Sequence, residues 1–195
     1  MNNTPAIGAA LPAHVPPPVP AAVNGPDEER RDYRPGYEIV AERILEQFEF
    51  RRVQEMAAGS LAATRATPAE LRTIEVAMQN CRHGFAQGQV DVFNQGDEDF
   101  HVGVAVASHN TFLVSTVRDA RRLQRQSSAI GIHDVLSEGT AAAVEEHEAI
   151  YRAIRDGRPE EAAKATADHL DRTLEDYRRE IQRRLFRPTG SQRAR

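Results

Sequence analysis

The sequence has almost no cysteine. Cys81 is the single cysteine among 195 residues, so the chain cannot form an intrachain disulfide. Disulfides stabilise many proteins of oxidising compartments, whereas a lone thiol is typical of a protein kept in a reducing cytoplasm. We therefore expect a cytoplasmic protein.

Long hydrophobic runs are also missing. The apolar run from Val102 to Ala107 is far shorter than the roughly 20 residues that a membrane-spanning helix needs. The N-terminus lacks the basic residues that open a secretory signal, and prolines interrupt its apolar residues. These absences predict a protein with neither a membrane span nor a secretory signal.

An excess of charge of one sign is missing as well. The chain has 25 Lys and Arg residues against 29 Asp and Glu residues, so it is not a polycation that would bind nucleic acid along its length. Arginines near the C-terminus could contact phosphates, but a solvated helix end accounts for them more simply. Hydrophobic residues at 40% and charged residues at 28% suit one soluble globular domain.

Proline separates a tail from the rest of the chain. Prolines recur in the first 35 residues, among them Pro5, Pro12, Pro16, Pro17, Pro18 and Pro20. They favour extended chain and cannot propagate a helix. We expect a disordered tail at residues 1–35, one folded domain at 36–187 and a second disordered tail at 188–195.

From Tyr37 onward, apolar residues recur at spacings of three and four, which predicts helices and no strands. Helices are expected from Tyr37 to about Ala62, from Pro68 to about Gly84, from Val90 to Ala107, from Phe112 to about Arg125, from Glu138 to about Ile154 and from Pro159 to about Leu185. The prediction is an all-α antiparallel bundle with short connections.

Local signals mark the ends of these helices. Thr67 and Glu70 form a capping box ahead of the second helix, and Gly157 suits a left-handed C-cap after the fifth. Residues 126–137 are expected to form a loop, at the end of which Ser137 caps the fifth helix. Gly96 and Gly103 weaken the third helix but allow close helix contact or room for a ligand.

The hydrophobic stripes predict which side chains are buried. The first helix is expected to bury Val53 among other residues, the third Val92, and the fourth Phe112, Leu113, Val117, Ala120 and Leu123. The fourth helix also carries Arg118, Arg121, Arg122 and Arg125, which are expected to lie largely on its other side.

One acidic residue and three histidines share a pattern that is typical of a metal site. Asp97 and His101 stand at positions i and i+4 of the third helix, and therefore on one face of it. His147 and His169 each lie midway along another amphipathic helix, and helices of a bundle can direct such side chains to one point. We predict that the four residues bind one divalent cation.

The ligand types limit the choice of metal. Imidazole nitrogens with one carboxylate suit zinc above all, and also nickel, manganese or iron. We favour six-fold coordination with two open positions, because purely structural zinc more often has sulfur ligands. Any one of these residues taken alone would more often be a surface or hydrogen-bonded core residue. The other histidines, His14, His83, His109 and His133, lack such placement.

Several separated motifs occur in a recognisable order between residues 48 and 185. They are Phe50-Arg51-Arg52-Val53-Gln54-Glu55, Asp97-Glu98-Asp99-Phe100-His101, Ser108-His109-Asn110, Glu146-His147-Glu148-Ala149-Ile150, Ala153-Ile154-Arg155-Asp156-Gly157, Ala162-Ala163 and His169-Leu170. In this order they resemble the C-terminal effector-binding (FCD-type) domain of GntR-type transcription regulators of the FadR subgroup.

The resemblance implies a six- or seven-helix bundle, a homodimer and a metal held by the four residues named above. It also implies a small organic acid that binds beside or onto the metal, with help from an arginine of the first helix. Arg51 occupies that place, and its neighbour Arg52 is the second candidate. Ser108-His109-Asn110 departs from the usual small-Gly-Asn turn of the family.

The family normally carries a winged-helix DNA-binding domain before the bundle. The proline-rich segment here is shorter than the about 50 residues that a folded domain needs. Residues 37–44 look like the opening helix of that domain, although the simpler interpretation is that residues 37–47 extend the first bundle helix. The chain is thus expected to be a stand-alone effector domain or one that has lost its DNA-binding domain, and DNA binding by the chain is not predicted.

Three functions fit these patterns. The first is a metal-dependent sensor of a small organic acid within a transcription regulator, which the motif order favours. The second is a metalloenzyme, but no carboxylate is clearly placed as a base and no His-Glu-x-x-His motif occurs. The third is a helical dimerisation protein whose polar residues bind nothing. We predict the first function and no enzymatic activity.

Overall fold

The computed structural model describes residues 37–126 and 138–185 of the chain. The tails predicted at 1–35 and 188–195 lie outside the described residues. So do Ser137 and the loop predicted at 126–137, apart from Gln126. None of the described helices combines the length and the apolarity that crossing a membrane requires.

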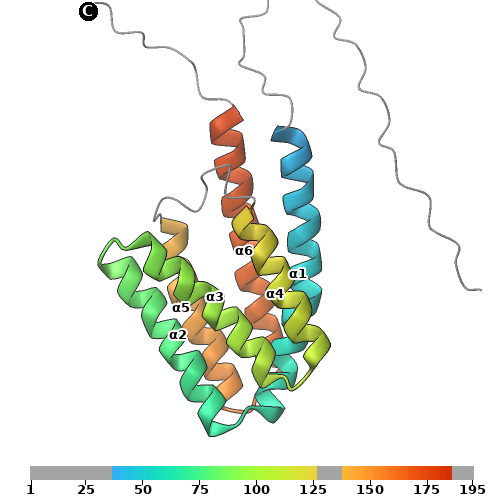
Figure 1. Ribbon diagram of the computed structural model, residues 1–195, viewed down its shortest axis with the longest axis vertical. Helices are drawn as coiled ribbons and strands as arrows, with labels where there is room; N and C mark the ends of the chain where they lie inside the picture. The colour runs from blue at the N-terminus through green and yellow to red at the C-terminus, as the bar shows by residue number, and fades with distance from the viewer. Residues whose placement is uncertain (1–36, 127–137, 186–195) are drawn as a thin grey trace, which may run out of the picture. The chain divides into compact units, whose positions relative to one another are not determined.

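Six α-helices and no strand occur in the described part of the chain. They are α1 (Tyr37–Arg65), α2 (Pro68–Ala86), α3 (Val90–Ala107), α4 (Thr111–Gln126), α5 (Glu138–Arg155) and α6 (Pro159–Leu185). Consecutive helices run in opposite directions, with α1 beside α6 and α2 beside α3 (Figure 1). The predicted all-α antiparallel bundle is confirmed.

The helix ends follow the local signals in the sequence. Thr67 accepts a hydrogen bond from the backbone N–H of Glu70, whose carboxylate accepts one from the backbone N–H of Thr67, so the capping box is present. Gly157 has a φ of +68°, as a left-handed C-cap requires. Because α1 is continuous from Tyr37, residues 37–47 extend the first bundle helix.

The turn between α3 and α4 has no glycine. His109 has a φ of 52°, a left-handed conformation that glycine adopts more readily. Its Nε2 atom lies 3.0 Å from both carboxylate oxygens of Glu70 on α2. Asn110 then caps α4, because its side-chain oxygen accepts hydrogen bonds from the backbone N–H groups of Phe112 and Leu113. The unusual turn is thus stabilised by side-chain contacts.

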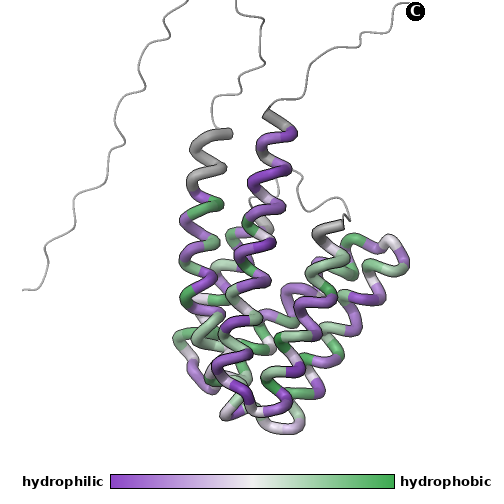
Figure 2. Tube along the Cα trace, turned by 180° about the vertical axis from the view of Figure 1, so that it is seen from behind, coloured by the Kyte–Doolittle hydropathy of each residue, from purple (hydrophilic) through white to green (hydrophobic). Residues whose placement is uncertain are grey.

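All six helices contribute side chains to the main hydrophobic core. Purple and green segments recur in turn along much of the described helices in Figure 2, as expected for helices with one buried face. The largest fully buried apolar side chains are Phe100, Ile74, Ile150, Ile154 and Leu170. Burial of each such side chain stabilises the fold by about 1.5–3 kcal/mol.

Some burial predictions were wrong. Val53, Val92, Phe112 and Leu123 are exposed, and Phe112 keeps 81% of its surface accessible. Arg121, which was expected on the outer side of α4, is buried instead. The buried stripe of α4 contains Leu113, Val117, Ala120, Arg121 and Gln124, which recur at intervals of three and four. Phe112 and Leu123 lie off this stripe, so helical period rather than hydrophobicity decided their burial.

Glycines bring α2 and α3 into close contact. A Cβ atom added at Gly96 would lie 2.7 Å from the backbone nitrogen of Cys81, and one at Gly84 would lie within 2.8 Å of the Cα atom of Phe93. Both obstacles are backbone atoms, which cannot turn away as the end of a side chain can. The close contact expected at Gly96 is therefore present. Because Asp97 directly follows Gly96 on α3, this contact also fixes where Asp97 lies.

Gly84→Ala should destabilise the domain by about 1–3 kcal/mol, because the added methyl group forces two backbones apart. This cost exceeds the gain in helix propensity from glycine to alanine, which is about 1 kcal/mol. Gly103→Ala is the matched control, since its Cβ would meet the Cγ1 atom of the Ile74 side chain at 3.2 Å and a backbone atom only at 3.9 Å. Urea denaturation should show no loss of stability for the control. Equal destabilisation of both variants would contradict the prediction.

Candidate metal centre

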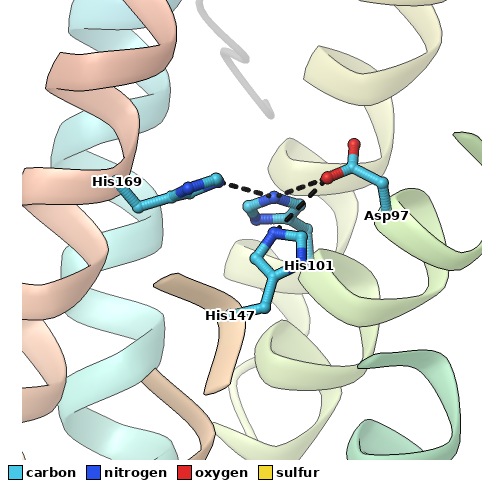
Figure 3. A group of neighbouring side chains, drawn as sticks. All are labelled: Asp97, His101, His147 and His169. Carbon is cyan, nitrogen blue, oxygen red and sulfur yellow. Dashed lines mark hydrogen bonds and ion pairs between the residues drawn. The ribbon is translucent and has the colours of Figure 1, made fainter. Parts of the chain in front are cut away.

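The structure brings together the four residues that the sequence singled out. Asp97 and His101 come from α3, His147 from α5 and His169 from α6. Each offers one ligand atom, and these atoms lie within 4.8 Å of one another. In Figure 3 the four side chains point toward one another in the interior of the bundle. Their convergence depends on the packing of α3 against α5 and α6, which follow it only after about 30 residues or more.

The distances within this group suit a shared cation. Oδ1 of Asp97 lies 3.6 Å from Nε2 of His101 and 3.4 Å from Nε2 of His147. Nε2 of His169 lies 3.4 Å from Nε2 of His101. A zinc ion bound at about 2.0–2.1 Å by each ligand holds neighbouring ligand atoms roughly 3–4 Å apart. The distances between these ligand atoms therefore match the distances between neighbouring ligands of one bound zinc ion.

His147 provides a test of whether these residues fit a metal. The ring is completely buried and stacks on Phe100 at 4.2 Å between ring centroids. Neither of its nitrogens has a hydrogen-bond partner among the described residues. A buried polar atom without a partner costs about 1–3 kcal/mol and calls for an explanation. A cation bound at Nε2 would supply the missing partner of that atom.

Carboxylates outside the group orient two of the rings. Nδ1 of His101 lies 2.6 Å from Oε2 of Glu55 on α1, and Nδ1 of His169 lies 3.0 Å from Oε2 of Glu146 on α5. A carboxylate on Nδ1 holds the ring in place and leaves Nε2 available as a ligand. Nε2 of His101 thus faces Asp97, and Nε2 of His169 faces Nε2 of His101.

Two of the imidazoles are held in the form that binds metals. Burial, together with the neighbouring His169, keeps the pKa of His147 well below its usual range. Burial and the neighbouring His101 lower the pKa of His169 to about 3. Both rings are therefore neutral near pH 7, and a neutral imidazole is the state in which histidine ligates a cation.

Asp97 is held as a carboxylate by Arg121 of α4. Burial opposes ionisation of Asp97, but the Arg121 guanidinium and the imidazoles of His101 and His147 outweigh it and hold the pKa well below its usual range. Arg121 contacts Oδ2 of Asp97, which leaves Oδ1 facing the histidines. The arrangement fixes which carboxylate oxygen is presented to a cation.

The two candidate arginines of α1 have different surroundings. Arg51 is 1% exposed, and its Nε donates to Oε1 of Glu55 at 2.7 Å. Arg52 lies at the surface, where its Nε donates to Asp171 at 2.9 Å. The structure therefore brings Arg51 next to the metal-site residues through Glu55 and does not bring Arg52 there.

Sequence reasoning missed several polar residues around the centre. They are Glu55 on α1, Arg121 and Gln124 on α4, Glu146 on α5 and Tyr177 on α6. Burial raises the pKa of Tyr177 to about 12, so its hydroxyl stays protonated. Helical spacing was the available signal, because Arg121 and Gln124 fall in register with the apolar stripe of α4. The histidines left out of the site stay outside it where described, since His83 is exposed and His109 pairs with Glu70.

The chain is similar to proteins of one family. The FCD domain family matches residues 46–172. The chain is 28% identical over 140 residues to the HTH-type transcriptional regulator LutR of Bacillus subtilis (strain 168), a match that covers 66% of this chain and 59% of LutR. The solved structure of Streptococcus agalactiae GntR superposes with a TM-score of 0.59 at 22% identity, covering 74% of this chain and 62% of that chain.

The chain spans only about three fifths of the length of each relative. The structural match at 22% identity supports the fold alone. Because the family match extends over more than half of the sequence, the chain belongs to the FCD family and carries the C-terminal domain type of GntR-family transcription regulators.

Proposed function

We propose that this domain is the effector-sensing part of a transcription regulator, in which a divalent cation and a small organic acid bind together. The proposal rests above all on the completely buried His147, whose Nε2 lies among three other potential ligands without a hydrogen-bond partner. Water cannot solvate this nitrogen from outside the bundle. A cation held by Asp97, His101, His147 and His169 accounts for both the convergence and the missing partner.

Zinc fits the ligand set best, and nickel, manganese or iron also accept three imidazoles with one carboxylate. A bound cation would supply positive charge and open coordination positions for a carboxylate. The chain's own contribution is a set of ligands held in place by Glu55, Glu146 and Arg121. Such outer contacts typically change metal affinity by about 10–100-fold.

Arg51 is the residue of α1 that we assign to the organic acid. Its guanidinium is buried, and its second terminal nitrogen has no hydrogen-bond partner among the described residues. Guanidinium groups bind carboxylates through paired, charge-assisted hydrogen bonds. An acid held between the cation and Arg51 would therefore connect α1 to the helices that carry the metal ligands.

This connection gives a physical route from binding to regulation. The cation would join α3, α5 and α6, and the acid would add α1 to them. A ligand shifts a conformational equilibrium only when it binds one state more tightly, so the helices must pack differently with and without the acid. In a homodimer, such repacking would alter the geometry between two copies of the domain.

Metal content tests the first half of the proposal. Wild-type protein, purified without a His tag, dialysed against zinc and desalted, should retain about one metal ion per chain by elemental analysis. His147→Gln and His169→Gln should each retain at least tenfold less, because each loses one ligand. His83→Gln changes an exposed histidine of α2 and should behave as wild type.

Far-UV circular dichroism should confirm that each of these variants remains helical. If wild-type protein holds no zinc, nickel, manganese or iron after desalting, the metal site does not exist as proposed. Retention of full metal content by both His147→Gln and His169→Gln would exclude this set of ligands.

Thermal unfolding tests the second half. A bound ligand at about 100 times its dissociation constant stabilises a protein by about 2.7 kcal/mol. A panel of small carboxylic acids should contain members that raise the melting temperature of zinc-loaded protein, and EDTA should abolish the increase. Identical melting curves with every acid, with and without EDTA, would refute acid binding.

The same assay distinguishes the two adjacent arginines. Arg51→Lys keeps a positive charge beside Glu55 but cannot present the paired donors of a guanidinium, so it should weaken acid binding at least tenfold while metal content is unchanged. Arg52→Lys is the matched surface control and should bind acids as wild type does. Equal behaviour of the two variants would remove Arg51 from the proposed site.

A further inference from the structure

Two buried guanidiniums from different helices converge on one neutral oxygen. A terminal nitrogen of Arg51 donates to Oε1 of Gln124 at 2.7 Å, and a terminal nitrogen of Arg121 donates to the same oxygen at 3.0 Å. The amide nitrogen of Gln124 in turn donates to the hydroxyl of Tyr177 at 2.9 Å. A carboxylate is a better acceptor than an amide for two guanidiniums, because charge-assisted hydrogen bonds are roughly twice as strong.

Not every N–H donor of the two buried guanidiniums has an acceptor among the described residues. Arg51 is 1% exposed and Arg121 is 7% exposed, so water does not solvate them freely. The second terminal nitrogen of Arg51 is buried and has no hydrogen-bond partner among the described residues. Arg51 thus has one buried donor left over beside the donor that the Gln124 oxygen accepts.

The summed charge of the metal-site residues and their neighbours also favours an anionic ligand. The guanidiniums of Arg51 and Arg121 are balanced by the carboxylates of Glu55 and Asp97, with which they form ion pairs. The ligating histidines are neutral when a metal is bound. Glu146, which contacts His169, forms an ion pair with Arg172. A bound divalent cation would therefore leave two uncompensated positive charges in the interior of the bundle, where unbalanced charge is costly. A dianion would neutralise them, and a monoanion would leave one.

We infer that the domain selects a small dicarboxylate. One carboxylate lies beside the cation held by Asp97 and the three histidines, and the other takes the place of the Gln124 side-chain oxygen between Arg51 and Arg121. The Gln124 side chain swings aside when the ligand binds, which makes this residue a determinant of specificity. This inference rests on the proposed function and adds the chemical class of the effector to it.

Isothermal titration of zinc-loaded wild-type protein tests the inference with chain-length-matched pairs. Malonate is compared with propionate, succinate with butyrate, and glutarate with valerate. At least one dicarboxylate should bind at least tenfold more tightly than its monocarboxylate partner. Elemental analysis after each titration should show that the zinc remains bound, so that chelation in solution does not contribute.

Gln124→Glu tests the location of the second carboxylate. The new side chain would place a permanent carboxylate between Arg51 and Arg121, so the advantage of the dicarboxylate over its partner should shrink to less than about threefold. Metal content should stay as in wild type, because Gln124 is not one of the four candidate metal ligands. Gln79→Glu, which adds the same charge at an exposed position of α2, should keep the full preference.

The outcomes separate this inference from the proposed function. If the protein binds every dicarboxylate and its matched monocarboxylate with equal affinity, the inference is overturned. The proposed function still stands in that case, because acids bind to the zinc-loaded protein. A full dicarboxylate preference in Gln124→Glu also overturns it, because the second carboxylate would then lie elsewhere. If no acid of either class binds to the zinc-loaded protein, both fail.

Discussion

Polar and ionisable side chains in the middle of a helical bundle are stable only when each finds a partner, and the arrangement around Asp97 follows from this constraint. Its two oxygens face in different directions, one toward Arg121 and the other toward His101 and His147. The same requirement places Glu55 between Arg51 and His101. His147 is left without a hydrogen-bond partner among the described residues, and this points to a bound cation.

The packing of the helices determines how accurately this centre is built. α3 carries two of the four candidate ligands, and its position is fixed by glycines that allow its backbone to touch that of α2. α1 and α4 carry the buried arginines Arg51 and Arg121, so these arginines and the metal-site residues lie on different helices. A ligand that contacted both sets would hold most of the bundle in one arrangement, which is the physical basis of a sensor.

Family membership and site geometry support different parts of the conclusion. The FCD match identifies the domain type and so the regulatory context. The identity of a ligand has to come from the residues of this chain, because one fold can carry many sites. Here the informative residues are polar members of the buried stripes, in particular Arg51, Arg121 and Gln124. Their side chains carry the argument for an acidic effector.

The sequence by itself determined the helical class, the helix boundaries from the Thr67 cap to Gly157, and the four candidate ligands, because helical period and capping are local properties. It did not determine that Arg121 turns inward or that Phe112 turns outward, since hydrophobicity and helical phase disagree at these positions. Only the tertiary structure decided that Arg51 and Arg121 meet at Gln124. That meeting depends on how α1 packs against α4, and no spacing along the chain encodes the rotation of one helix about its axis relative to another.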